Sequence, residues 1–508
     1  MNRPSVAMFL FLSFILLVVL IFHQFYWRRR NLPNGPLPLP IIGNAHTFLK
    51  TERWEDQFLK WREEFGPIYT YWLGPMAVVS VNDYETMQKM FVHDGDTYAD
   101  REPIKAFDDL VRGGIHGLIE TSGNLWSQQR RFSLKVLRDL GLGKNVMQER
   151  ILNEFQVVRQ NIDAEIKSGA KEIDFHRHTD ICTGSVINAL ICNVRFTEKD
   201  HQKHFYMLKE VTEKIMKDFS KPLMSIIIST PTLAKLPVLR QVIEKAGNLS
   251  QPIFEFLNRM IDEHLKLNDY TDNNFEPQDF IDAYLLEQSR QERQNNNNHY
   301  FTRQQLLNVL FDLWFAGQET TSTTLTWGFA YLIRHPEAQQ KLHAELDRVI
   351  GSDRLITMSD KNDLPYTNAV IMEIQRCANI VGQNSPRRTT REVEIANCKL
   401  PKGTVVIPQI SVPLVDPKIF PEPKKFNPDR FIDENGKLKR CDELMPFSLG
   451  KRQCLGEGIA RAELFLFIAN LCNAYKLYAG EKEPTLLKTN GGGSISTQPY
   501  KARVVQRH

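Results

Sequence analysis

Cys454 stands in a segment whose residue types suit a metal-bound thiolate. The segment reads Phe447-Ser448-Leu449-Gly450-Lys451-Arg452-Gln453-Cys454-Leu455-Gly456. A thiolate ligand needs deprotonation, shielding from water and N–H donors aimed at its sulfur. Gly450 and Gly456 give the backbone room for a close approach, and the helix-like run after Cys454 presents its positive end. For a lone cysteine, a buried and inert thiol would be the better interpretation, but the residues around this one favour a ligand.

A second segment places polar chemistry inside an apolar helix. The sequence Ala316-Gly317-Gln318-Glu319-Thr320-Thr321 follows a stretch that is apolar nearly all round, which predicts burial. Gly317 would leave a groove for a diatomic ligand, and Glu319 and Thr320 could deliver protons there. Alternatively, the threonines only bond back to a carbonyl one turn earlier and bend the helix. The segment by itself leaves both interpretations open.

These two segments resemble those of the cytochrome P-450 monooxygenases. The ligand loop of that family has an aromatic ring, two glycines, an arginine and the ligand, matched here by Phe447, Gly450, Arg452, Cys454 and Gly456. Its oxygen-activation motif is matched by Ala316, Gly317, Glu319 and Thr320. The resemblance covers the whole chain and is nearest to the microsomal branch that oxidises drugs, fatty acids and steroids.

The resemblance implies haem b, an iron protoporphyrin IX ligated by the Cys454 thiolate, with O2 as cosubstrate. The haem carries two propionates, which need charged donors when partly buried. Arg452, together with Trp126 and Arg130 of a Trp-x-x-x-Arg segment, would meet them. Arg387 follows Pro386 where a basic residue of the family meets the other propionate, but its neighbour Arg388 leaves that assignment open by one position.

A third feature has a structural role in the family. Glu373 and Arg376 stand three residues apart on a predicted helix, which alone would be an ordinary surface pair. By resemblance, Arg430 in the segment Phe426-Asn427-Pro428-Asp429-Arg430-Phe431 completes a Glu-Arg-Arg cluster that fixes the core behind the haem.

The elements that must position these residues are mostly helical in pattern. The clearest helix is expected over residues 302–334, because Thr302 with Gln305 has the sequence of a capping box and His335-Pro336 stops it. Short strands are expected near residues 68–81 and 388–407. The resemblance implies a mainly α fold with small β-sheets, the cytochrome P-450 fold, preceded by a single N-terminal transmembrane helix.

The N-terminus predicts a membrane anchor. Residues 6–26 are almost uninterruptedly apolar, and about 20 residues span a hydrocarbon core of roughly 30 Å. Trp27 and three arginines follow, against a single arginine ahead, which puts the bulk of the chain on the cytosolic side. A cleaved signal peptide is the rival, but the apolar run is longer than its usual core and no small-x-small site follows. We expect residues 1–27 to be the anchor, 28–44 a basic, proline-rich hinge and 45–508 the haem-thiolate catalytic domain, at the endoplasmic reticulum membrane.

Composition excludes several other classes. Seven cysteines are an odd number without a C-x-x-C pair, which argues against a disulfide framework or zinc ribbon. A net charge of +4 is too mild to imply nucleic acid. Because no dinucleotide fingerprint occurs, electrons must come from elsewhere. The resemblance implies an NADPH-dependent flavoprotein reductase, with cytochrome b5 as a further candidate donor. Cationic residues could steer such an acidic partner, or could simply form a solvated face: Arg131, Lys135, Arg138 and Lys451.

The function implied is monooxygenation of an apolar small molecule, whether fatty acid, steroid or xenobiotic. Substrate, O2, two electrons and two protons give hydroxylated product and water. The family's substrate-contact regions correspond to residues 107–119, 312–316, 381–385 and 494–496. One rival is a haem-thiolate isomerase, which need not keep the pair Glu319 and Thr320. Another is a membrane-anchored haem sensor, which the sequence leaves open.

Overall fold

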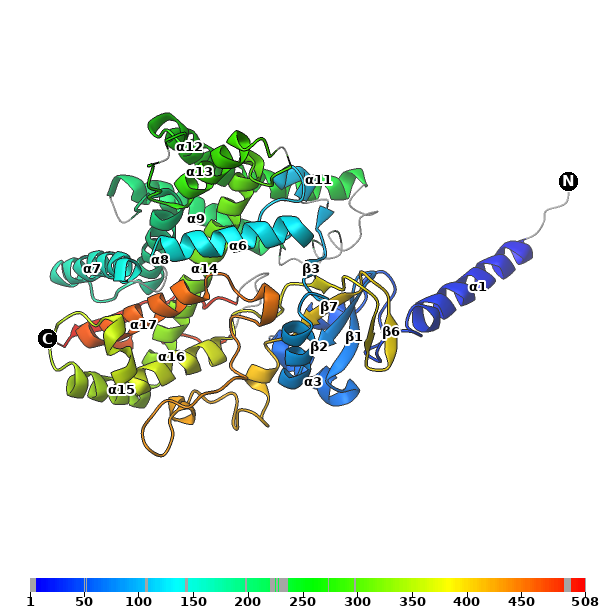
Figure 1. The fold of residues 1–508 in the computed structure, drawn as a ribbon. Coiled ribbons are helices and arrows are strands. Elements are labelled where there is room, and N and C mark those ends of the chain that lie inside the picture. The colour runs from blue at the N-terminus through cyan, green and yellow to red at the C-terminus, as the bar shows by residue number, and fades with distance from the viewer. Residues whose placement is uncertain are drawn as a thin grey trace.

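A computed structural model describes residues 6–49, 51, 53–105, 108–141, 145–196, 199–219, 224, 227, 236–272, 274–296, 298–487 and 495–507. The fold is mainly helical with small sheets, which confirms the expected class (Figure 1). The longer helices are α1 (Val6–Phe22), α3 (Trp54–Phe65), α6 (Gly123–Asp139), α7 (Asn145–Lys167), α8 (Phe175–Cys192), α9 (Lys199–Phe219), α11 (Pro237–Leu249), α12 (Gln251–Leu267), α13 (Phe280–Arg293), α14 (Arg303–Arg334), α15 (Pro336–Val349), α16 (Pro365–Ala378) and α17 (Glu457–Ala474). Two short ones are α2 (Ala45–Leu49) and α4 (Tyr84–Met87).

Helix α14 runs through the middle of the helical region and is buried for most of its length (Figure 1). Its bounds confirm the helix expected over residues 302–334. The Thr302 side chain caps it by accepting the backbone N–H of Gln305 at 3.2 Å. In a capping box the Gln305 side chain would also bond the backbone N–H of Thr302. Here the Gln305 side chain instead accepts the N–H of Gly117 and donates to the carbonyl of the same residue. The glutamine therefore fastens a loop to the helix.

The strands confirm both expected regions. Among the described residues, one sheet has five strands in the order β1-β2-β7-β4-β3, and two further sheets have two strands each. Strands β1 and β2 form an antiparallel hairpin, while β2 and β7 run parallel. The strands are β1 (Ile68–Leu73), β2 (Met76–Val81), β3 (Asp100–Arg101), β4 (Arg387–Arg388), β5 (Val393–Ile395), β6 (Cys398–Leu400), β7 (Val405–Pro408), β8 (Tyr475–Ala479) and β9 (Ala502–Gln506).

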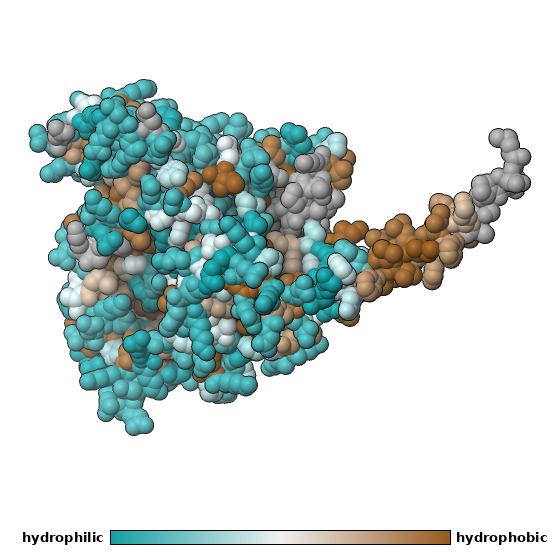
Figure 2. Space-filling view, turned by 45° about the vertical axis from the view of Figure 1, so that its right-hand side comes forward, coloured by the Kyte–Doolittle hydropathy of each residue, from teal (hydrophilic) through white to brown (hydrophobic). Residues whose placement is uncertain are grey.

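Helix α1 stands away from the body of the molecule (Figure 1). It continues through a π-helical turn, His23–Trp27, and the stretch Met8–Trp27 is long and apolar enough to cross a membrane. From Met8 onward its side chains are exposed, and they form a brown apolar rod beside a largely teal body (Figure 2). The segment after it packs on β1, where a Cβ at Gly35 would overlap the backbone carbonyl of Thr70.

One partly buried histidine makes the packing of α12 on α13 depend on pH. His264 lies with Nε2 at 2.7 Å from Asp279 Oδ2 and Nδ1 at 2.7 Å from the Met260 carbonyl. Burial alone would lower the pKa of His264, but the bond to Asp279 and its charge outweigh this and raise the pKa to about 9. The protonated form is therefore the one that the folded state stabilises.

We expect this contribution to be fully present below pH 6.5, the ordinary pKa of histidine, and to be lost as the pH rises through about 9. A hydrogen bond to a charged group contributes about 1.5–3 kcal/mol. Hydrogen exchange in α12 and α13, compared at pH 7 and pH 9.5 after correction for intrinsic rates, should show lost protection in the wild type. His264→Asn should show the loss already at pH 7. Equal protection of the wild type at both pH values would contradict the assignment.

Candidate active site

A cavity of about 350 Å³ lies between α14 and the segment that carries Cys454. Cys454 and Phe447 line one side, and Gly317 and Thr320 of α14 line another. Further lining residues come from α6, from the segment after α16 and from α17: Trp126, Arg130, Val381, Ser385, Ile459 and Glu463. The structure thus brings the two predicted chemical segments, far apart in the sequence, to a single cavity.

The loop around Cys454 presents the sulfur to this cavity. All seven cysteines are free, and only Cys454 is exposed. The backbone N–H of Cys454 donates to the carbonyl of Phe447 at 2.9 Å, which closes the loop just before α17. Burial from bulk water raises the pKa of the thiol, while the N–H groups of Gly456 and Glu457 and the charge of Arg130 oppose that rise. These donors are the ones that a thiolate ligand requires.

Gly450 and Gly456 have different roles. Gly450 has φ +71°, and a Cβ there would overlap the backbone carbonyl of Phe91. A side chain is therefore excluded by both conformation and space. At Gly456 a Cβ would meet no other atom within 4 Å, so the protein chain alone does not require this glycine.

Gly450→Ala is expected to destabilise the ligand loop by about 2–5 kcal/mol, because a left-handed backbone conformation and a steric overlap add up. Gly436 is a matched control, since its φ is +73° and a Cβ there would have no neighbour within 4 Å. Gly436→Ala should therefore cost only about 1–2 kcal/mol. Chemical denaturation and the ratio of haem to protein measure both effects. Equal losses in the two variants would show that the contact with Phe91 is unimportant.

Four arginines gather beside the cavity; Arg387 and Arg452 are buried, and Arg101 and Arg130 are partly buried. Arg101 and Arg387 lie directly opposite each other in the pairing of β3 with β4, although like charges at such positions are destabilising. Arg130 donates to the Gln453 carbonyl at 2.6 Å, and Arg452 to three backbone carbonyls, including that of Thr121. Among the described residues, no ion pair links any of the four to a carboxylate.

Their electrostatics indicate an anionic guest. Burial lowers the pKa of all four guanidinium groups. For Arg101 the charge of Glu120 partly opposes this, and repulsion between the arginines adds to it for Arg101, Arg387 and Arg452. The pKa of Arg452 falls to about 8. Nε and Nη1 of Arg387 are buried without a hydrogen-bond partner. Such a cluster is costly unless a negative group offsets it. The two propionates of a haem are the kind of group that these residues fit.

The structure places the adjacent residues Arg387 and Arg388 in different surroundings. Arg388 pairs with Glu102 at 3.0 Å and donates to the Gly403 carbonyl, so it faces away from the cluster. Arg387 is 1% exposed and lies over the ring of Phe91. The arrangement favours Arg387 for the propionate. Arg101 was missed by the sequence analysis, because a lone arginine on a two-residue strand gives no local signal.

Trp126 and Arg452 form one unit within the cluster. The Arg452 guanidinium lies 3.8 Å from the centre of the Trp126 ring. This stacking, with the three carbonyl contacts of Arg452, fixes both side chains at the edge of the cavity. The resemblance implied that both residues lie at a propionate, and the structure brings them together.

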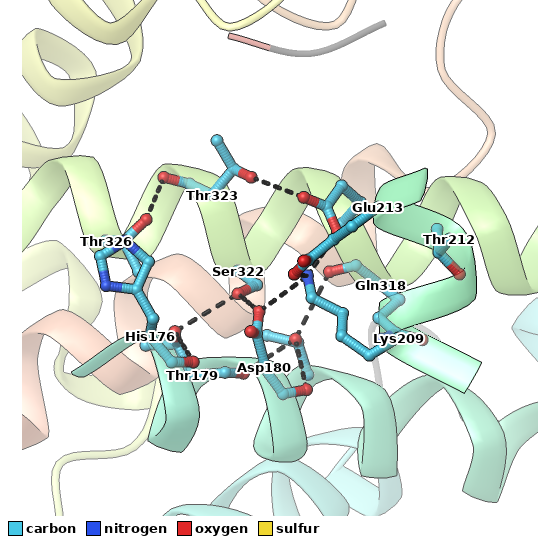
Figure 3. A network of polar contacts seen from close by, with 12 residues as sticks. His176, Thr179, Asp180, Lys209, Thr212, Glu213, Gln318, Ser322, Thr323 and Thr326 are labelled. Atoms are coloured by element: carbon cyan, nitrogen blue, oxygen red, sulfur yellow. Dashed lines mark hydrogen bonds and ion pairs between the residues drawn. The ribbon is translucent and has the colours of Figure 1, made fainter. Parts of the chain in front are cut away.

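Glu319 does not reach the cavity. Its Oε2 lies 2.5 Å from Nζ of Lys209 on α9, and Lys209 in turn pairs with Asp180 on α8 at 3.1 Å. Ser322 donates to Asp180, so the network joins α8, α9 and α14 (Figure 3). Burial would lower the pKa of Lys209, but the two carboxylates raise it. Lys209 is thus held as a cation against Glu319, an arrangement that a motif of six residues could not reveal.

Thr320 faces the cavity and also bonds back to the helix. Its hydroxyl donates to the Ala316 carbonyl at 2.8 Å, which is the contact expected from the alternative interpretation. Because Thr320 also lines the cavity, the two interpretations are compatible. A Cβ at Gly317 would lie 2.9 Å from two side-chain atoms of Ile187, so this glycine also permits close packing of α14 on α8.

Glu463 is a second acid that the sequence analysis missed. It lies on α17, is 3% exposed and lines the same cavity. Burial raises its pKa to about 8, partly offset by a hydrogen bond with Thr321. The available signal was a single carboxylate within the apolar run from Ala462 to Phe467.

The predicted Glu-Arg-Arg residues meet in the core. Glu373 accepts two bonds from Arg376 at 2.7 and 2.8 Å and one from Arg430 at 3.1 Å. The N–H of Asn427 donates to the same carboxylate. Arg376 also donates to the Leu414 carbonyl, so the cluster ties α16 to the segment that precedes the ligand loop.

Three of the four expected substrate-contact regions line the cavity. The first region contributes Leu118 and Ile119, the second Asp312, Leu313 and Ala316, and the third Val381, Asn384 and Ser385. In the fourth, Ile495 is buried and does not line it, while Ser494 and Phe107 lie outside the described residues. Asp312 accepts the N–H groups of Leu118 and Ile119, so it holds the loop to α14.

Comparison with known proteins gives one consistent result. The cytochrome P450 family model matches residues 33–505. Rabbit (Oryctolagus cuniculus) cytochrome P450 2C4 is 35% identical over 450 residues, covering 88% of each chain. Mouse (Mus musculus) cytochrome P450 2B19 is 34% identical over 508 residues and covers 99% of each. Rabbit cytochrome P450 2E1 is 35% identical over 474 residues, covering 91% of this chain and 90% of its own.

Proposed function

The chain belongs to the cytochrome P450 family, and from this premise we propose which of its residues serve the family's reaction. The protein is a haem-thiolate monooxygenase that inserts one atom of O2 into an apolar organic substrate, with electrons from NADPH supplied through a flavoprotein reductase. The observation that carries the residue assignment is the cavity in which Cys454 and Thr320 meet beside the arginine cluster.

We propose that Cys454 would supply the thiolate ligand of a haem and that the arginine cluster would bind its propionates. Arg101, Arg130 and Arg387 would offer guanidinium donors, and the unit of Trp126 and Arg452 would close the same edge. When bound, the haem supplies the iron at which O2 is activated, and a thiolate ligand favours cleavage of the O–O bond. The chain itself orients the substrate, excludes water and delivers protons.

For proton delivery, we propose that Thr320 is the group nearest the chemistry. Its hydroxyl lies at the cavity wall and can pass a proton by rotating away from the Ala316 carbonyl. Glu319 would pass protons to Thr320, and it could do so only when its ion pair with Lys209 opens. Glu463 is buried in the same cavity and is a candidate reserve of protons.

Thr320→Ala is expected to uncouple the reaction, so that NADPH is still consumed but hydrogen peroxide is released instead of product. General acid catalysis contributes about 10²–10⁴-fold, so product per NADPH should fall at least about tenfold. Thr326→Ala is the control, because Thr326 donates to the Thr323 carbonyl and does not line the cavity. An unchanged coupling ratio in Thr320→Ala would remove Thr320 from proton delivery. Product without NADPH and reductase would instead favour an isomerase.

We further propose the cellular setting. Residues 1–27 would anchor the protein in the endoplasmic reticulum membrane. Residues 28–44 would form the hinge between this anchor and the catalytic domain, residues 45–508, on the cytosolic side. The apolar helix at the N-terminus supports the anchor. The electron donors would be the NADPH-dependent reductase and cytochrome b5. Of the cationic residues considered for docking, Lys451 pairs with Asp96 at 3.1 Å.

A further inference from the structure

A second, smaller cavity lies where the membrane helix meets the folded domain. It has a volume of about 180 Å³ and is separate from the haem cavity. One wall comes from the end of the apolar helix and the residues after it, including Tyr26, Arg29 and Arg30. The other comes from Thr70 and Trp72 of β1. The cavity therefore exists only because the connecting segment folds back onto the sheet.

The cavity has a cationic wall, and none of its lining residues is acidic. Arg29 donates to the carbonyls of Phe25 and Gly35, and Arg30 lies 3.6 Å over the ring of Trp27. Within the described part of the chain, neither arginine forms an ion pair with a carboxylate. Arg28 is held apart from them by the ring of Trp72 and the carbonyl of Pro75. Two positive charges thus remain available to an anion at one point of the surface.

The opposite wall supplies an unused hydroxyl. Thr70 is 2% exposed, and its Oγ1 is buried without any hydrogen-bond partner. Side chains alternate along a strand, so Thr70 and Trp72 point to one face of β1, while Tyr69 and Tyr71 enter the aromatic core on the other. A buried hydroxyl without a partner is costly. A ligand with acceptor oxygens would relieve that cost.

The cavity directly follows the apolar stretch that is long enough to cross a membrane. The membrane-spanning stretch ends at Trp27, and Arg29 and Arg30 follow at once. In Figure 2 the brown apolar rod joins the body at this point. Basic residues just beyond a membrane helix are attracted to anionic headgroups, and arginine pairs well with phosphate oxygens. Gly35 allows the connecting segment to lie this close to β1, because a Cβ there would overlap the Thr70 carbonyl.

We propose that this cavity is a binding site for the phosphate group of a phospholipid. Arg29 and Arg30 bind the phosphate oxygens, Thr70 donates its hydroxyl to them, and Tyr26 and Trp72 flank the headgroup. Bound lipid would fix the catalytic domain against the membrane surface. The same chemistry could be met by free phosphate, and the experiment below distinguishes the two sources.

Native mass spectrometry of the full-length holoprotein, released from detergent, tests the site. The probes are dioleoyl phosphatidylserine, dioleoylglycerol with the same tails but no phosphate, and inorganic phosphate as competitor. We expect wild type to retain one phosphatidylserine and no dioleoylglycerol. Retention should fall about tenfold in Thr70→Val, which changes no charge, and in Arg29→Gln with Arg30→Gln. Displacement by inorganic phosphate would identify a free-phosphate site, and resistance to it a lipid site.

Two controls separate the site from general effects. Thr70→Ser keeps the hydroxyl and should retain lipid as wild type does. Lys439→Gln with Arg440→Gln removes two charges from exposed positions far along the chain and should also have no effect. Equal retention by Thr70→Val and wild type, or equal retention of dioleoylglycerol and phosphatidylserine, would overturn the proposal.

Discussion

Cys454→Ser is expected to abolish substrate oxidation while the chain still folds. The Cys454 backbone contact with Phe447 does not involve the sulfur, so the loop should keep its shape. A serine hydroxyl remains protonated near neutral pH and cannot replace a thiolate as an electron-donating ligand. Product formed per NADPH, measured with added reductase, should fall to the level of a reaction without the monooxygenase.

Cys398→Ser is the matched control, since Cys398 is half-buried on β6 and does not line the haem cavity. Its activity should equal that of the wild type. Circular dichroism of both variants reports whether they fold. A folded Cys454→Ser protein that still forms product at the wild-type rate would contradict the assignment of the ligand.

Glu373→Gln is expected to have the largest effect on stability. The Glu373 carboxylate is fully buried and offsets two arginine charges. Removing one partner of a buried ion pair costs about 3–5 kcal/mol, because the remaining charges lose their counter-ion. Since the free energy of unfolding of folded proteins is only about 5–15 kcal/mol, the substitution would remove a large part of it. Chemical denaturation and the yield of haem-loaded protein measure this.

Asp429→Asn provides the comparison on the same part of the chain. Asp429 pairs with Lys341 at 2.8 Å, but both side chains are more than half exposed. An exposed pair contributes about 0–1 kcal/mol, so this acid-to-amide change should be nearly neutral. Similar stability of Glu373→Gln and Asp429→Asn would show that the cluster does not hold the core together.

The sequence predicted the parts of the fold that depend on local patterns. The long helix α14 followed from its cap and from His335-Pro336, whereas the ligand loop was expected from the resemblance of the residues around Cys454 to the family's loop. Glu319 could not be placed in this way, because its direction depends on Lys209, which comes from another helix. Arg101 and Glu463 were missed for the same reason: their roles arise only where separate elements meet at the cavity.

The most direct test of the ligand assignment is the absorbance difference spectrum of the dithionite-reduced holoprotein with and without carbon monoxide, recorded for wild type and Cys454→Ser. Thiolate ligation predicts a strongly red-shifted Soret band in wild type that is absent from the variant. Absence of that band from folded, haem-loaded wild type, or its persistence in Cys454→Ser, would contradict Cys454 as the thiolate ligand and remove the basis of the proposed site.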